Sequence, residues 1–416
     1  MNEERLRKLL RDAELPDEAG ARERGWRVVR AAYEGRAAAP PPAHTRGRLA
    51  LALALAGAAI LAIVLTPAGA KVADVFRNVA GIGNENAKPA LSSLPAPGRL
   101  LVGSAQGAWV VNPDGSKRLL GDYRGATWSP HGLFVAMTRN HQLAAVEPGT
   151  GTVRWTLASQ HRLSDPAWSP SGYRIAYRAG HELRVVAGDG SPDRGVARET
   201  AAVTPTWRPL SRLGRLTREK GATPAEELAY ADHAGRVRVL GLAEGRPVPR
   251  ARLVWESAPR SAPHTLLWTP DRRRLVAVGR HAVRVFGGTG TLERTLSLPP
   301  GMVAGAAALG PDSRTLAVAT SRMTTTGVPH GAIKVFDLAG RSKSRQVFSG
   351  PGRFASLAFS PNGRWLLLGW RDANQWVFVP LAGGHPKAVS HISQQFAPGA
   401  SGPGAFPRLD GWCCSG

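Results

Sequence analysis

The chain has 416 residues and a formal net charge of +24 at pH 7, from 54 Lys and Arg against 30 Asp and Glu. Such a charge is typical of nucleic-acid-binding proteins. Here, however, nearly all basic residues are arginines scattered along a chain rich in Ala, Gly and Pro, so we expect no nucleic-acid partner. The sequence contains no CxxC, HExxH, GxSxG or P-loop motif, and it therefore predicts no metal site, cofactor or catalytic residue.

Two short helices are predicted at the N-terminus, over residues 3–12 and 18–35, with Pro16 between them. One interpretation is a docking site for a cytoplasmic partner. The interpretation that we favour is a basic amphipathic tail that rests on anionic lipid. A Pro-rich linker completes this segment, which spans residues 1–48. The apolar stripes of the two helices are Leu6, Leu9 and Leu10, and Trp26, Val29 and Tyr33.

An uncharged apolar segment follows, from Leu49 to Leu65, with the length of a short membrane-spanning helix. Arg46 and Arg48 lie on its N-terminal side. The positive-inside rule therefore places residues 1–48 in the cytoplasm and the remainder of the chain outside the cell membrane.

A signal peptide cleaved after Ala70 is the alternative to this anchor, because small residues precede that position. The charged leader of almost 50 residues is, however, too long for an ordinary signal peptide. We therefore expect a single-pass membrane protein, with its span at residues 49–66 and a linker at residues 67–97.

The remainder, residues 98–416, repeats one short phrase: an aromatic residue or Leu, then usually Ser or Thr, then Pro, then polar turn residues. Successive copies lie about 40 residues or more apart, and a period near 40 is typical of a β-propeller, in which each repeat is a four-stranded blade. The copies are WSPHG from Trp128, WSPSG from Trp168, WRPLS from Trp207, WTPDR from Trp268, LGPDS from Leu309 and FSPNG from Phe359.

The chemistry of the phrase predicts a strand, a tight turn and a second strand. Pro has a fixed φ and cannot continue a central strand, so it starts the turn. Alternating residues such as Val283-Arg284-Val285 predict a third strand after the second. We expect second strands over residues 133–138, 174–178, 275–279, 315–320 and 365–370, and third strands over residues 183–187, 282–286, 333–338 and 375–380.

Both ends of the repeat array are incomplete. The residues from Trp412 onward match the start of a phrase without the strands that follow it, whereas residues 99–120 resemble second, third and fourth strands without a first. We predict that residues 406–412 pair with residues 99–104 and close the ring, which removes exposed sheet edges. The fold is then all-β with seven blades, or with six if the weak copy at Trp207 is an insertion.

The only two cysteines, Cys413 and Cys414, are adjacent in this closing segment. In an oxidising compartment they can form a disulfide with each other or with another chain. The interpretation that we favour is that they replace the Ser-Pro of the phrase as small turn residues.

The phrase at Trp168, with the apolar strands from Tyr173 to Tyr177 and from Leu183 to Val186, resembles the TolB-like or WD40-like (PD40-type) propeller repeat of bacterial envelope proteins. The resemblance covers residues 98–416 and implies a propeller of the cell envelope. It does not imply one function, because this repeat serves translocation accessories, peptidase gating domains and binding modules. An anchor stands in place of the separate domain of the Tol-Pal component, and no hydrolase domain follows, so neither role is expected.

The turns between second and third strands repeatedly contain Arg or His. In a propeller these turns share one face, so they predict a basic ring that attracts an anionic polymer or an acidic surface of an envelope protein. The alternative is that turns are polar and that this chain is rich in Arg. The residues are Arg139, His141, Arg178, His181, His233, Arg280, His281, Arg322, His330 and Arg371.

Two classes of function are compatible with the sequence. We favour a membrane-tethered, extracytoplasmic propeller that acts as a protein- or glycan-binding scaffold and is not an enzyme. The alternative is a propeller enzyme that acts on an envelope polymer in its central channel. Such an enzyme needs convergent carboxylates, whereas Asp114, Asp271 and Asp312 are predicted to lie in turns.

Overall fold

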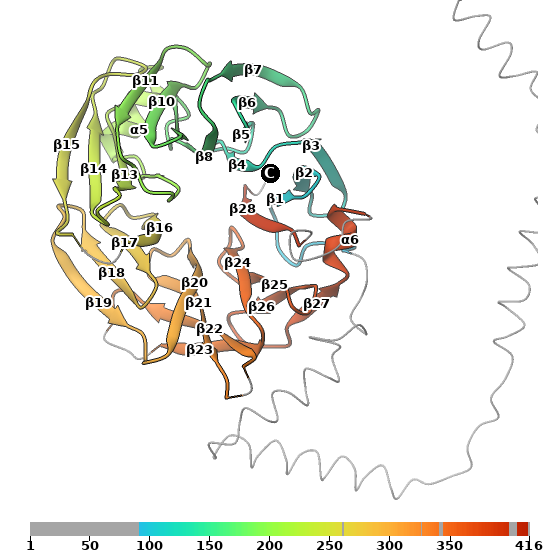
Figure 1. The fold of residues 1–416 in the computed structure, drawn as a ribbon. Coiled ribbons are helices and arrows are strands. Elements are labelled where there is room, and N and C mark those ends of the chain that lie inside the picture. Colours follow the sequence, from blue (N-terminus) through green and yellow to red (C-terminus); the bar gives the residue numbers. More distant parts are fainter. Residues whose placement is uncertain (1–90, 260–261, 326, 341–343, 399–405, 415–416) are drawn as a thin grey trace, which may run out of the picture. The chain divides into compact units, whose positions relative to one another are not determined.

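Seven four-stranded antiparallel sheets surround a central channel (Figure 1). The computed structural model describes residues 91–259, 262–325, 327–340, 344–398 and 406–414. The predicted N-terminal helices, the predicted span at 49–65 and most of the linker lie outside the described residues. None of the helices that the structure describes has the length and apolar character needed to cross a bilayer.

The first four blades take their strands in the order of the chain, apart from the innermost strand of blade 1. Blade 1 consists of β28 (Arg408–Cys413), β1 (Arg99–Ser104), β2 (Gly107–Val111) and β3 (Lys117–Gly121). Blade 2 consists of β4 (Gly125–Trp128), β5 (Val135–Arg139), β6 (Gln142–Val146) and β7 (Val153–Ala158). Blade 3 consists of β8 (Leu163–Trp168), β9 (Arg174–Ala179), β10 (Glu182–Ala187) and β11 (Asp193–Ala197). Blade 4 consists of β12 (Thr206–Trp207), β13 (Glu226–Ala231), β14 (Val237–Leu242) and β15 (Ala251–Glu256).

The last three blades follow the same plan. Blade 5 consists of β16 (Pro263–Trp268), β17 (Arg274–Gly279), β18 (Ala282–Gly287) and β19 (Leu292–Ser297). Blade 6 consists of β20 (Met302–Leu309), β21 (Thr315–Met323), β22 (Pro329–Asp337) and β23 (Arg345–Pro351). Blade 7 consists of β24 (Phe354–Phe359), β25 (Trp365–Trp370), β26 (Gln375–Pro380) and β27 (Lys387–Ser390). Two short helices, α5 (Arg212–Glu219) and α6 (Ile392–Phe396), stand outside the sheets.

The count of seven is confirmed, and the weak phrase at Trp207 belongs to a true blade. Its first strand, β12, has only two residues, which pair with Leu228 and Ala229 of β13. The long interval to the next phrase arises because helix α5 is inserted between β12 and β13. A six-bladed ring is therefore excluded.

The predicted closure of the ring is also confirmed. Strand β28 pairs antiparallel with β1, with Leu100 opposite Trp412 and Val102 opposite Leu409. All four of these side chains are buried. The last described strand thus completes the first blade, and the sheet of blade 1 has no missing inner strand (Figure 1).

The turn of the repeated phrase is stabilised by the Ser or Thr that follows the aromatic residue. In blade 3 the buried Ser169 Oγ accepts the backbone N–H of Arg174 at 3.2 Å, and the N–H of Gly172 donates to the Ser169 carbonyl at 3.0 Å. Ser129, Thr269 and Ser360 make the same pair of bonds in blades 2, 5 and 7. The phrase therefore reverses the chain with its buried polar groups satisfied.

The fifth residue of the phrase has a left-handed backbone, which explains why Gly is common there. Gly132, Gly172 and Gly363 have φ values of 67°, 85° and 68°. Arg272 and Ser313 adopt the same conformation, with φ values of 68° and 61°, although they have side chains. The turn geometry is thus conserved between blades even where its preferred residue is absent.

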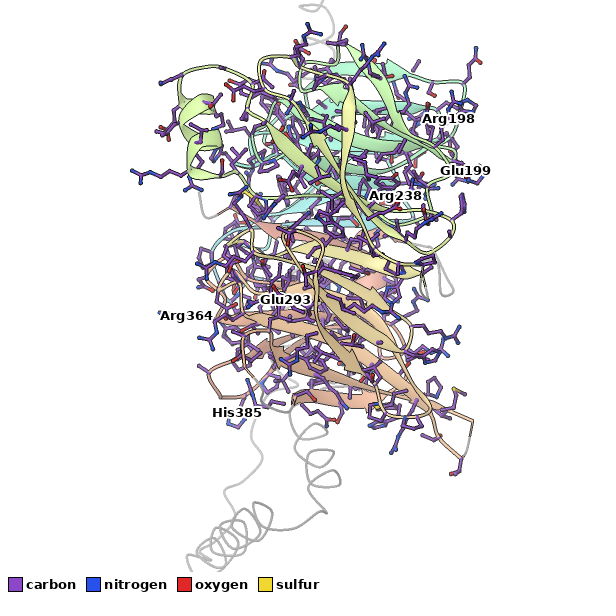
Figure 2. The ribbon with its side chains drawn as sticks, turned by 90° about the vertical axis from the view of Figure 1, so that its left-hand side faces the viewer. Arg198, Glu199, Arg238, Glu293, Arg364 and His385 are labelled. Carbon is purple, nitrogen blue, oxygen red and sulfur yellow. A yellow bond between two sulfur atoms is a disulfide. The ribbon has the colours of Figure 1, made fainter. Side chains whose placement is uncertain are left out.

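Because neighbouring strands in each blade are antiparallel, successive connections lie alternately on two opposite faces of the ring. We call the face with the turns between strands 1 and 2, and between strands 3 and 4, the phrase face. The opposite face, with the turns between strands 2 and 3 and between blades, is called the ring face. In Figure 2, helix α5, Arg364 and His385 lie on the phrase side, and Arg198 and Glu199 lie on the other.

A fully buried ion pair joins blades 3 and 4. Arg174 Nη1 lies 2.8 Å from Glu226 Oε2, and both side chains are completely shielded from solvent. The remaining guanidinium N–H groups donate to four backbone carbonyls of blade 4, those of Pro224, Ala243, Arg246 and Pro247. Burial raises the pKa of Glu226, and Arg174 opposes that shift. This single side chain therefore binds both the loop that follows α5 and the loop between β14 and β15.

We predict that removal of residues 403–416 lowers the free energy of unfolding by at least about 3 kcal/mol, because Leu409 and Trp412 lose their burial and β1 becomes an exposed edge. Denaturant unfolding and size-exclusion chromatography measure the two effects, and removal of residues 415–416 alone is the control. An unchanged unfolding midpoint in a monomeric truncated protein would contradict the assigned closure.

Arg174→Met should lower the free energy of unfolding by about 3–5 kcal/mol, because Glu226 is left buried without its partner. Arg274→Met is a matched control, since Arg274 has the same place after the phrase of blade 5. Its ion pair with Glu293 is partly exposed, so we expect a loss of about 1 kcal/mol or less. Equal losses in the two variants, measured by urea unfolding, would disprove the special role of Arg174.

Candidate functional site

Most of the Arg and His residues predicted as a basic ring lie in or beside connections of the ring face. Arg139, Arg280, Arg322 and Arg371 are exposed at the ends of β5, β17, β21 and β25. Within the described part of the chain, none of these four has a carboxylate partner within ion-pair distance. Their charge is thus not neutralised locally.

Two histidines of the predicted ring contact each other across the boundary of blades 3 and 4. His233 Nε2 lies 3.2 Å from His181 Nδ1, and both side chains are exposed. Their ring centroids are 5.1 Å apart. Backbone bonds hold the two turns, because His233 N–H donates to the Glu199 carbonyl and Thr200 N–H donates to the His181 carbonyl. His141 and His281 are exposed in the corresponding turns of blades 2 and 5.

Arg178 differs from the sequence-based expectation. Strand β9 continues through this residue to Ala179, so Arg178 belongs to the strand and its side chain is buried. Its Nη1 lies 2.9 Å from Asp165 Oδ2 on β8, and its Nη2 donates to the Gly180 carbonyl. Arg178 is therefore paired with a residue of the channel wall and is not available to a partner on the ring face.

His330 also lies in a strand. Strands β21 and β22 have nine residues each and form the longest hairpin of the described chain. Arg322 and His330 face each other across it, and His330 is half-buried. The hairpin carries the exposed Met323 and Val328 near its tip, so blade 6 has the longest projection that the structure describes on the ring face.

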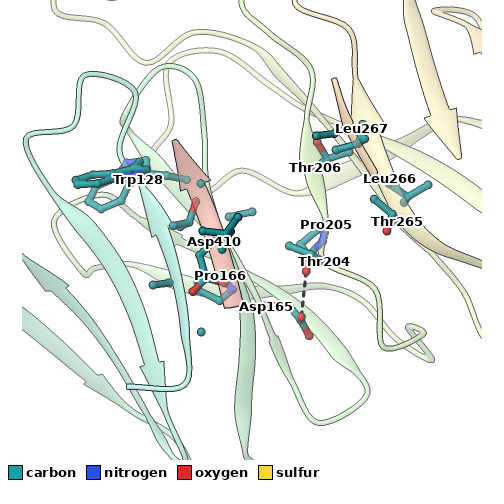
Figure 3. A pocket seen from close by; sticks show the side chains of 18 of the residues that line it. Trp128, Asp165, Pro166, Thr204, Pro205, Thr206, Thr265, Leu266, Leu267 and Asp410 are labelled. Carbon is teal, nitrogen blue, oxygen red and sulfur yellow. Dashed lines mark hydrogen bonds between the residues drawn. The ribbon is translucent and has the colours of Figure 1, made fainter. Parts of the chain in front are cut away.

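The innermost strands of the blades line a central cavity of about 1100 Å³. Its wall is mostly small or apolar, and the charged residues that line it are few. Figure 3 shows Asp165, Thr204 and Asp410 on this wall. The other charged or titratable residues that line it are Arg124, Arg162, His264 and Arg408.

Asp410 of β28 is a buried carboxylate in this wall. Its Oδ1 lies 2.6 Å from Arg408 Nε, whereas its Oδ2 has no hydrogen-bond partner within the described residues. Burial raises the pKa of Asp410, and the nearby Arg408 opposes that effect. Arg408 itself is more exposed and donates to the Arg124 carbonyl of blade 2 at 3.0 Å.

Asp165 forms a second polar cluster, which joins blade 3 to the loop before blade 4. A bulge in β8 gives Asp165 a positive φ of 54°. Its carboxylate accepts the hydroxyl groups of Ser164 and Thr204, at 2.7 Å and 3.1 Å (Figure 3). Together with the Arg178 pair, these bonds use both oxygens of Asp165, so the cluster fixes the geometry of the channel wall.

Each channel carboxylate is thus paired with an arginine. No group of three or more His, Cys, Asp or Glu side chains suited to a metal ion occurs among the residues that the structure describes.

The sequence did not point to Asp165 or Asp410 as channel residues. The local signal is that each is a charged residue inside a first strand. Asp165 directly precedes Pro166, and Asp410 lies within the closing segment.

Cys413 and Cys414 form a disulfide with each other in the structure. It lies beside the phrase of blade 2, because a Cβ placed on Gly132 would approach the Cys414 sulfur within 2.8 Å. Arg99 crosses the same boundary, where it donates to the Gly132 carbonyl and lies over the Trp128 ring at 4.9 Å. The disulfide therefore belongs to the packing between blades 1 and 2.

No protein-family model matches the chain, and no curated protein matches it. Among solved structures, it is similar to a putative 6-phosphogluconolactonase from Bacteroides uniformis (TM-score 0.51, 16% identity, 70% of this chain and 95% of that one). It is also similar to a functionally unknown protein from Desulfotomaculum acetoxidans (TM-score 0.52, 12% identity, 71% and 95% covered). A Kuenenia stuttgartiensis hydrazine synthase chain has a TM-score of 0.49 at 13% identity, with 74% and 81% covered. At these identities the comparisons show the propeller fold alone.

Proposed function

We propose that this chain is a membrane-tethered propeller outside the cell membrane, which binds an anionic partner through its ring face. The observation that carries the proposal is the set of exposed, unneutralised arginines on that face, at Arg139, Arg280, Arg322 and Arg371. Of the acidic residues on the same face, Asp122 and Asp232 are paired with arginines, whereas the exposed Glu199 and Asp372 have no ion-pair partner among the described residues. An acidic protein surface or an anionic envelope polymer fits this charge.

The tether follows from the sequence, where the apolar segment 49–65 has arginines on its N-terminal side. The TolB-like character of the repeat supports an envelope location. A channel enzyme is less favoured, because each channel carboxylate is paired with an arginine. A pair of carboxylates acting on a glycosidic bond would have to be free to exchange protons or attack a sugar carbon.

We predict that protease added to intact spheroplasts degrades residues 71–416 and spares residues 1–48, because the anchor holds the propeller outside. Antibodies against tags at the two ends of the chain measure both parts. Recovery of a mature chain that begins at Lys71 would establish a cleaved signal in place of the anchor.

Replacement of Arg139, Arg280 and Arg371 by Gln should abolish salt-sensitive capture of the partner from envelope extract, since attraction between exposed charges falls off over a Debye length of about 8 Å. The fold should persist, because exposed substitutions usually change stability by about 0.5 kcal/mol or less. Arg118, Arg273 and Arg364 provide an equally exposed control triple on or near the phrase face. Capture that is reduced equally by both triples would mean that net charge, and not the ring face, attracts the partner.

A further inference from the structure

Helix α5 is a basic amphipathic helix on the phrase face. Leu213 and Leu216 lie three residues apart, and 69% and 45% of their surfaces are exposed. Gly214 is the buried residue of the helix. An exposed pair of leucines of this kind is unusual on a short surface helix, because such residues normally face a core.

Three arginines, Arg212, Arg215 and Arg218, surround these leucines at intervals of three residues. Across the described chain they have no carboxylate within ion-pair distance. Arg272 lies close by, and its pKa is lowered by burial and then by the positive charges of Arg208 and Arg215. Glu227, which lies 2.9 Å from Arg208, opposes this effect at Arg272, so among the described residues it is the three arginines of the helix that lack an ion-pair partner.

The helix is held firmly against the propeller. Its N-cap Ser211 accepts the N–H of Gly214 at 2.9 Å, and Arg218 Nη1 contacts His131 Nε2 of the blade 2 phrase at 2.9 Å. The loop after the helix is fixed by the buried Arg174, which binds the Pro224 carbonyl. The leucines and arginines are thus presented by a rigid element with a defined direction.

The chain that arrives from the predicted anchor joins the propeller on this same face. Leu94 N–H donates to the Pro113 carbonyl at 2.8 Å, in the connection between β2 and β3. The Leu91 carbonyl lies against Gly115, where a Cβ would approach it within 2.4 Å. This connection joins strands 3 and 4 of blade 1, so it belongs to the phrase face, as α5 does.

We propose that α5 docks the phrase face on an anionic lipid surface, with Leu213 and Leu216 between the headgroups and Arg212, Arg215 and Arg218 on lipid phosphates. The inference rests on the proposed tether, which would keep this face within reach of the bilayer. Residues 66–90 span at most roughly 85 Å when fully extended. Basic residues with adjacent leucines are the features by which interfacial helices bind anionic membranes. Docking would turn the ring face away from the membrane and toward other partners.

The test uses the full chain in vesicles of phosphatidylcholine, with or without phosphatidylglycerol. A fluorophore on Leu213→Cys reports contact with the bilayer, because nitroxide groups on the lipid chains quench it only at short range. Cys413 and Cys414 are joined in a disulfide and do not react with the label. We expect strong quenching in vesicles that contain phosphatidylglycerol, little in phosphatidylcholine alone, and loss of quenching at high salt.

Two controls distinguish docking from general proximity. The same label on Arg280→Cys, on the ring face, should remain unquenched in all vesicles. Replacement of Arg212 and Arg215 by Gln, which keeps the contact between Arg218 and His131, should weaken docking on the order of 10-fold or more, whereas the Arg139, Arg280 and Arg371 triple should leave it unchanged.

Flotation of the vesicles separates this inference from the tether itself. A chain that floats while the label at residue 213 stays unquenched would overturn docking and leave the tether in place. A chain that fails to float with phosphatidylcholine vesicles, but is quenched by vesicles with phosphatidylglycerol, would support docking and refute the tether. Equal quenching at residues 213 and 280 would also overturn the proposal.

Discussion

The tight turn of the repeated phrase organises the ring, and blades 2, 3, 5 and 7 each have it between their first and second strands. A buried hydroxyl, such as Ser169 Oγ, accepts a backbone N–H five residues later, and the fifth residue of the phrase has a positive φ. The turn fixes where the inner strand ends and the second strand begins. Repetition around the ring gathers these turns on one face and the turns between second and third strands on the other.

The two faces carry different side chains because each is formed by a different set of connections between strands. The ring face contains short turns between second and third strands. Exposed residues in these turns, such as Arg280 and the His181–His233 pair, lack carboxylate partners within the described residues. The phrase face receives the inserted helix α5 and the chain that precedes β1. Beside this insertion, Arg174 joins blade 3 to blade 4 through a buried ion pair and four bonds to backbone carbonyls.

Local chemistry explains which features could be predicted from the sequence. The repeated phrase and the incomplete ends favour seven blades over six and predict the pairing of β28 with β1, because both features depend on a repeated local signal. The site was less predictable. Its position after the second strand predicts an exposed turn residue at Arg178, yet β9 extends one residue past it and its buried side chain pairs with Asp165. Asp410 reaches the channel through closure of the ring, and no neighbour in the sequence indicates its burial.

We propose that the propeller has one face toward the membrane and one away from it. Electron cryo-microscopy of the full chain in lipid nanodiscs that contain phosphatidylglycerol tests this most directly. We expect a seven-bladed ring whose phrase face and α5 lie against the bilayer, with the β21–β22 hairpin of the ring face pointing away. A ring whose hairpin faces the lipid, or one with no preferred orientation, would contradict it.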